Sequence, residues 1–81
     1  MKVVIYLPEA QKALLRMPSN TSARIRSKIA AYATNPASQA NNVKALLDGS
    51  IRLQVGDWRV IMDNGAVLET VRVGPRGSVY K

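Results

Sequence analysis

Two turn sequences in the second half of the chain limit the folds that it can adopt. Gly56-Asp57 and Asn64-Gly65 each follow a run rich in β-branched and apolar residues. Asn-Gly is typical of type I′ hairpin turns, and a type II′ turn requires glycine at its first central position. Two such turns in succession predict a three-stranded antiparallel meander that begins at Ile51 and ends at Val73.

These turns also predict which side chains share a face, because directly opposed residues on neighbouring strands point to the same side. With two-residue turns, Val55 lies opposite Trp58 and Met62 lies opposite Val67. The predicted core face carries Ile51, Leu53, Val55, Trp58, Val60, Met62, Val67, Val71 and Val73, with Glu69 as its only charged member. The opposite face carries Arg52, Gln54, Arg59, Ile61, Leu68, Thr70 and Arg72.

The first half of the chain predicts one strand and two helices. Residues 2–7 are mostly β-branched or aromatic and end at Pro8, as a strand would. Apolar residues then recur with helical spacing over residues 8–17 and 19–35, while residues 36–43 show no periodicity and predict a connector. The predicted buried stripes are Ala10, Ala13, Leu14 and Met17 in the first helix, and Ile25, Ile29, Tyr32 and Ala33 in the second.

Together these elements predict an α+β fold in a single domain, residues 1–81. The expected order is a strand, two helices, the three-stranded meander and a short C-terminal strand at residues 78–81. Both helices are expected on one face of a small, mainly antiparallel sheet, because only one face of the meander is apolar.

Composition narrows the function classes. The chain has 81 residues, a formal net charge of +7, and neither cysteine nor histidine. Disulfide bonds, thiolate nucleophiles and Cys/His zinc sites are therefore excluded, and we expect no metal and no cofactor. The positive charge favours a polyanion or an acidic protein as partner, with a basic surface that has no dedicated ligand as the alternative. No apolar run approaches about 18 residues, so we expect no membrane contact and a cytoplasmic location.

The polar face of the meander carries arginines from three adjacent strands. A guanidinium group offers several donors in a rigid fork that matches phosphate oxygens, and it stays charged at physiological pH. RNA carries its own nucleophile in the 2′-hydroxyl, so a protein can cleave it by positioning and charge stabilisation alone. The alternative is an ordinary solvent-facing surface on a small sheet.

Two segments carry a resemblance to a known family. Residues 52–61, RLQVGDWRVI, resemble the R-L-R-V-G-D-Y-R-V-I-Y signature of RelE/ParE-superfamily toxins. Residues 71–80, VRVGPRGSVY, are similar to their closing V-x-x-V-G-H-R-x-x-V-Y. With the similar upstream layout, the resemblance covers essentially the whole chain. It implies a toxin of a type II toxin–antitoxin system, closer to the RelE-like mRNA interferases that act on the ribosome, and a cognate antitoxin as partner.

The resemblance also implies roles for individual residues. Arg59 matches the arginine that supports the transition-state phosphate, and Arg76 matches one assigned to leaving-group protonation or phosphate contact. Tyr80 matches a terminal tyrosine that orients the RNA, with simple packing of the chain terminus as the alternative. Lys44 and Arg52 match the basic residues that bind RNA.

Several positions depart from the RelE-type pattern. Arg52 stands where these enzymes often carry a lysine, and a guanidinium is a poor proton acceptor. Pro75 and Met62 stand where histidine and tyrosine are frequent. These departures keep two other functions open: a ParE-like inhibitor of DNA gyrase, and a toxin relic that acts only as a binding module.

Overall fold

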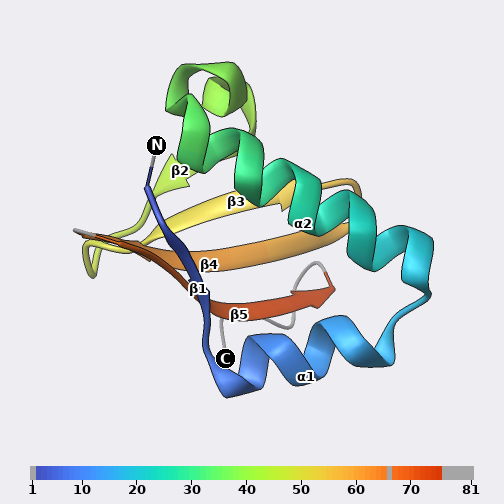
Figure 1. Cartoon of the computed structure of the whole chain (residues 1–81). Coiled ribbons are helices and arrows are strands. Elements are labelled where there is room, and N and C mark those ends of the chain that lie inside the picture. The colour runs from blue at the N-terminus through green and yellow to red at the C-terminus, as the bar shows by residue number, and fades with distance from the viewer. Residues whose placement is uncertain (1, 66, 76–81) are drawn as a thin grey trace.

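The fold is α+β, as predicted, in a computed structural model that describes residues 2–65 and 67–75. Within these ranges a five-stranded sheet has the order β1-β5-β4-β3-β2 (Figure 1). Neighbouring strands are antiparallel except β1 and β5, which are parallel. The elements are β1 (Val4–Tyr6), α1 (Pro8–Arg16), α2 (Ser19–Thr34), the 3₁₀ helix η1 (Pro36–Asn42), β2 (Val43–Ala45), β3 (Ile51–Val55), β4 (Trp58–Asn64) and β5 (Leu68–Pro75).

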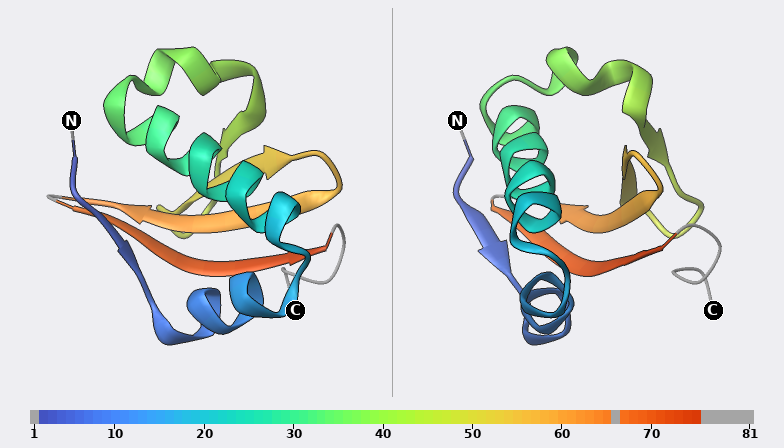
Figure 2. Two further views of the ribbon diagram at one scale, coloured as in Figure 1. Left: turned by 45° about the vertical axis from the view of Figure 1, so that its right-hand side comes forward. Right: turned by 90° about the vertical axis from the view of Figure 1, so that its right-hand side faces the viewer.

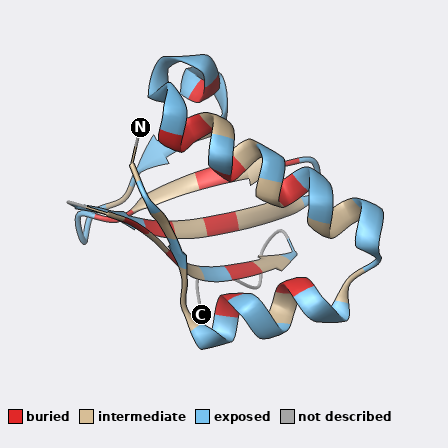
Figure 3. Ribbon diagram, viewed as in Figure 1, coloured by how far each residue is buried: buried red, intermediate tan, exposed pale blue. Residues whose placement is uncertain are grey.

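The two α-helices cover the same side of the sheet, and no helix formed by the described residues covers its other side (Figure 2). Pro8 opens α1, where its missing N–H costs nothing. Pro18 then separates the helices. The predicted stripes are confirmed: Ala10 and Leu14 of α1 are buried, with Ala13 and Met17 packed against the core, and Ile25, Ile29, Tyr32 and Ala33 of α2 are all buried (Figure 3).

The hairpin between β3 and β4 has the predicted register. Val55 pairs with Trp58 and Ile51 pairs with Met62. Gly56 has a φ of +59°, and among the described residues only glycines have a positive φ. The Gly56-Asp57 sequence predicted a type II′ turn, in which only the first central residue has a positive φ, and the φ angles of the structure agree with this turn.

The hairpin between β4 and β5 differs from the prediction. Asn64 pairs with Leu68, so the connection is one residue longer than a two-residue turn. Within it the Gly65 N–H donates to the Val67 carbonyl oxygen at 3.1 Å. The predicted pair of Met62 with Val67 is therefore wrong, and Met62 pairs with Thr70 instead.

A β-bulge in β5 then changes which residues face the core. Ile61 pairs with Arg72 whereas the next residue, Met62, pairs with Thr70, so Val71 is the extra residue. The longer loop and this bulge place Leu68 and Thr70 in the core, both with 0% exposure, and bring Val73 to the same face beyond the bulge. Glu69 therefore lies opposite the core face, not on it as predicted, and no Asp or Glu among the described residues is buried.

Two further predictions concern the ends of elements. Strand β2 begins at the end of the segment for which a connector was expected, and β5 continues through Gly74 to Pro75, past the predicted end of the meander at Val73. The predicted C-terminal strand at residues 78–81 lies outside the described residues.

Candidate functional site

The face of the sheet opposite the helices carries a row of four paired residues across four strands, three of them basic. Lys44 on β2 pairs with Arg52 on β3, Arg52 pairs with Ile61 on β4, and Ile61 pairs with Arg72 on β5. Paired residues point to the same side of a sheet. These four residues, Lys44, Arg52, Ile61 and Arg72, are called the basic row below.

Arg59 lies in a second row, two residues away along β4. It pairs with Gln54 on β3 and with Gly74 on β5. Arg59 is thus the diagonal neighbour of Arg52, and Cα atoms in such positions are about 7–8 Å apart. Two guanidinium groups on stems of this length can reach one phosphodiester group or two successive ones.

The burial of these residues differs along the rows. Arg52 and Arg59, on the inner strands β3 and β4, are half-buried, whereas Lys44 and Arg72 are exposed. The Nε atoms of Arg52 and Arg59 are themselves buried, so each guanidinium group lies at least partly against the sheet. The inner pair is therefore more restricted in position than the outer pair.

Arg72 forms an ion pair with the first turn of α1. Its Nε lies 3.8 Å from Oε2 of Glu9, and the two side chains are 45% and 71% exposed. An ion pair this exposed contributes about 0–1 kcal/mol. In the register that the two-residue turns predicted, Arg72 would lie across from Asp57. The bulge places it opposite Ile61 instead, in the basic row.

The strands that carry Lys44 and Arg52 are joined by a tightly bonded turn. The Leu46 N–H donates to the Ser50 carbonyl oxygen at 2.9 Å. Asp48 Oδ1 accepts from the Ser50 hydroxyl at 2.6 Å and from its N–H at 3.0 Å, and these bonds hold the pKa of Asp48 below its ordinary value. The turn therefore fixes the register of β2 against β3.

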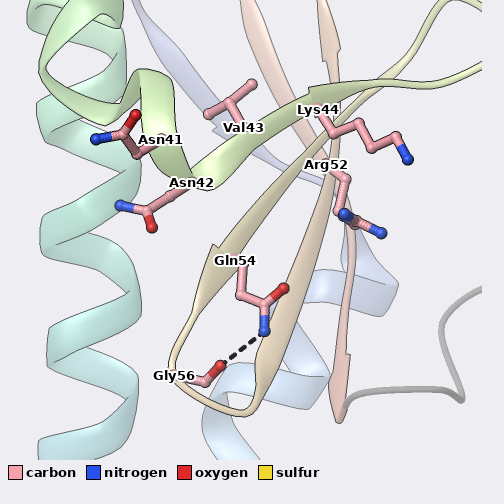
Figure 4. Close-up of a pocket in the computed structure, with 7 residues that line it drawn as sticks. All are labelled: Asn41, Asn42, Val43, Lys44, Arg52, Gln54 and Gly56. Carbon is pink, nitrogen blue, oxygen red and sulfur yellow. Dashed lines mark hydrogen bonds between the residues drawn. The ribbon is translucent and has the colours of Figure 1, made fainter.

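A cavity of about 560 Å³ opens at the β2–β3 end of the site. Figure 4 shows Arg52 and Gln54 following one another along β3, with Asn42 at the junction of η1 and β2. The Gln54 amide donates from Nε2 to the Gly56 carbonyl oxygen at 3.1 Å. Asn41, Asn42 and Lys44 line the cavity with these two residues.

The structure brings together three of the five predicted site residues. Arg59, Arg52 and Lys44 lie on one face, in the two rows described above. Arg76 and Tyr80 lie outside the described residues. Sequence reasoning gave no role to the amides of Asn41 and Asn42, because it treated their segment as a connector. The polar–apolar–polar alternation of residues 42–44 is the signal that was available, and it is too short to predict a strand alone.

Two other kinds of site are absent from the described residues. In residues 2–65 and 67–75, no three His, Cys, Asp or Glu side chains are grouped so that they could hold a metal ion. Within the same ranges, no helix has the length and apolar character needed to cross a membrane.

Comparison with known proteins identifies the family. Residues 4–80 match the family model of the ParE toxin of the type II toxin–antitoxin system parDE. The chain belongs to this family. No curated protein matches the toxin's sequence.

Solved structures with the same fold come from toxin–antitoxin complexes. A chain of the archaeal RelE–RelB complex of Pyrococcus horikoshii has a TM-score of 0.76 at 20% identity, over 96% of the toxin described here and 98% of that chain. For the RelB–RelE complex of Methanococcus jannaschii the values are 0.73 and 21%, over 95% of each chain. For the intact RelBE complex of E. coli they are 0.69 and 18%, over 93% and 96%. These structures show the fold, and the family match shows that the toxin is a member of the RelE/ParE superfamily, as its sequence motifs indicated.

Proposed function

We propose that this toxin is a ribosome-dependent mRNA endoribonuclease that inhibits translation. The observation that carries the proposal is the placement of Arg59 beside the basic row, on the face of the sheet opposite the helices. An extended surface with several guanidinium groups suits an RNA backbone, because phosphate contacts dominate the affinity for nucleic acid.

In the proposed reaction the RNA supplies its own nucleophile. The 2′-hydroxyl oxygen attacks the adjacent phosphorus, the bond to the 5′-oxygen breaks, and a 2′,3′-cyclic phosphate and a 5′-hydroxyl remain. Negative charge builds on the non-bridging oxygens as the phosphorus becomes five-coordinate. A half-buried Arg59 that is already in place stabilises this charge without reorganisation at the moment of reaction.

The other proposed residues position the RNA. Lys44 and Arg52 hold the flanking phosphates, and Arg76 and Tyr80 complete the site by contacting the phosphate and orienting the RNA. Arginine cannot serve as a general base at neutral pH, and the chain contains no histidine. In-line positioning and charge stabilisation therefore supply most of the rate enhancement in this proposal.

The proposed partners follow from the site and from the matched structures. Those structures are toxin–antitoxin complexes of RelE with RelB, which supports a cognate antitoxin for this toxin as well. A net charge of +7 favours an acidic antitoxin. Ribosomes carrying mRNA, in the cytoplasm, are the proposed target.

Primer extension on cellular mRNA after induction of the toxin tests the nuclease activity. We expect new 5′ ends within translated regions, and none when the toxin is added to the same mRNA without ribosomes. Intact mRNA in cells whose growth has stopped would reject this activity.

A second function has a specific observation in its favour. The family model that matches the chain is that of the ParE toxin, and the sequence resemblance left a ParE-like inhibitor of DNA gyrase open. Under this alternative the purified toxin inhibits DNA supercoiling by gyrase, and mRNA stays intact after induction. The supercoiling assay and primer extension, run on the same toxin, distinguish the two functions.

A further inference from the structure

The candidate site changes in character from one end to the other. Toward β4 and β5 it presents guanidinium groups, whereas the cavity at the β2–β3 end adds the neutral amides of Asn42 and Gln54 beside Lys44 and Arg52. We infer that this cavity binds one nucleobase of the RNA, adenine by preference, and that Gln54 and Asn42 read its edge. This inference rests on the proposed RNA-cleaving function and adds a sequence preference to it.

The position of the cavity fits a base next to the phosphate at Arg59. Gln54 is the direct pair partner of Arg59, so the two side chains extend from opposed positions on neighbouring strands and toward the same face. Asn42 ends η1, one residue before the Val43–Leu53 pair, and it lines the same cavity as Gln54. A nucleotide whose phosphate contacts Arg59 can therefore reach the cavity with its own base or with the adjacent one.

The size of the cavity also suits a base. Its volume of about 560 Å³ lies within the range of roughly 300–1,000 Å³ that is usual for small-ligand sites. Single-stranded RNA offers unstacked bases whose edges are open to hydrogen bonding. The described lining contains no carboxylate that would repel the RNA backbone.

The chemistry of the amides favours reading a base over binding another phosphate. The hydrogen bond from Gln54 Nε2 to the Gly56 carbonyl fixes the amide plane, because the reverse orientation would set two oxygens against each other. The Gln54 Oε1 then remains an acceptor, and Nε2 keeps a second hydrogen to donate. Asn and Gln amides pair with adenine, which presents an amino donor beside a ring-nitrogen acceptor.

Binding of non-cleavable RNA tests the cavity separately from catalysis. The probes are short fluorescein-labelled oligonucleotides with 2′-O-methyl sugars, which lack the nucleophile. Each probe carries adenine, uracil or an abasic residue at one test position. The series places this test position at each point along the strand in turn. Fluorescence anisotropy at low salt measures their affinity for the wild type, Gln54→Ala, Asn42→Ala and a matched control, Asn35→Ala, which removes an exposed amide outside the cavity.

For one test position in the oligonucleotide, we expect the wild type and Asn35→Ala to bind the adenine probe about tenfold more tightly than the abasic probe. We expect Gln54→Ala and Asn42→Ala to lose most of this preference while circular dichroism shows an unchanged fold. Equal affinity for all probes, no binding by the wild type, or a preference that survives in both variants overturns the inference. A preference that depends on Gln54 and Asn42, in a toxin that cuts no mRNA on ribosomes, supports the cavity and contradicts the nuclease proposal instead.

Discussion

Arg52 and Arg59 occupy diagonal positions on strands β3 and β4, each opposite a residue of the other strand, Ile61 and Gln54 respectively. Both side chains are half-buried, and both lie on the face opposite the helices. The backbone positions from which the two guanidinium groups extend are therefore set by the hairpin at Gly56, whose register the sequence predicted correctly. This arrangement makes the contribution of each arginine to activity testable without disturbing the core.

The first prediction concerns Arg59. Arg59→Ala should lower the single-turnover rate of mRNA cleavage on ribosomes by about 10²–10³-fold, as the loss of one preorganised donor does. Arg59→Lys should recover only part of the rate, because an ammonium group keeps the charge but not the fork of donors. Arg16→Ala, which removes an exposed arginine from α1, is the matched control and should cleave like the wild type. A folded Arg59→Ala variant with the wild-type rate would contradict the nuclease proposal.

The second prediction tests the bulge in β5. Leu68 is fully buried, so Leu68→Ala should lower the free energy of unfolding by about 2–5 kcal/mol. Val71 is the extra residue of the bulge and only half-buried, so Val71→Ala should cost less than about 1.5 kcal/mol. Urea denaturation followed by the fluorescence of Trp58 measures both. The unbulged register that the turn sequences predicted requires the opposite order, with Val71 in the core and Leu68 outside it.

The parts of the fold that were predicted correctly depend on local signals. Prolines at positions 8, 18 and 36 limit the helices, and the buried stripes of both helices have the 3.6-residue period. The register at Gly56 follows from a turn that needs a left-handed residue. Along β3 and β4, the alternation of side chains between the two faces correctly predicted that Arg52, Gln54 and Arg59 share one face.

The parts that were not predicted depend on packing between distant segments. Asn64-Gly65 specifies a turn, but the choice of loop length and bulge is decided by burying Leu68 under the helices instead of Glu69. Strand β2 has only three residues, Val-Lys-Ala, too few for an alternation to show, so it forms only because β3 offers it an edge. For this reason the sequence alone did not place Lys44 opposite Arg52 or bring Asn42 to the cavity.

The third prediction concerns Thr70, which has 0% exposure in the core face of β5. Within residues 2–65 and 67–75, its Oγ1 has no hydrogen-bond partner. A buried hydroxyl without a partner costs about 1–3 kcal/mol of desolvation, so Thr70→Val should raise the free energy of unfolding by about 1 kcal/mol or more. Thr70→Ser, which keeps the hydroxyl and removes the methyl group, should lower it by about 1 kcal/mol. A Thr70→Val variant that is less stable than the wild type would mean that the hydroxyl is bonded.

The fourth prediction concerns the turn that aligns β2 with β3. The pKa of Asp48 lies below its ordinary value, first because of the hydrogen bond from the Ser50 side chain and then because of the bond from the Ser50 N–H. Ser50→Ala removes the larger cause, so the pKa of Asp48 should rise toward its ordinary value. Carbon-13 NMR titration of the Asp48 carboxyl group measures it directly, and an unchanged pKa would contradict the geometry of the turn.

This pKa also predicts how the stability of the toxin depends on pH. A carboxyl group whose pKa is lower in the folded state than in the unfolded state stabilises the fold above its unfolded pKa, near 4, and loses this effect as pH falls through its folded pKa. Acid unfolding of the wild type should therefore include a contribution from Asp48 that starts below about pH 4. In Ser50→Ala this contribution should shrink, and in Asp48→Asn it should be absent, because an amide does not titrate. Thermal unfolding of the three proteins at neutral pH and at steps below pH 4 measures the difference. Parallel loss of stability with falling pH in the wild type and Asp48→Asn would show that other carboxylates alone control acid unfolding.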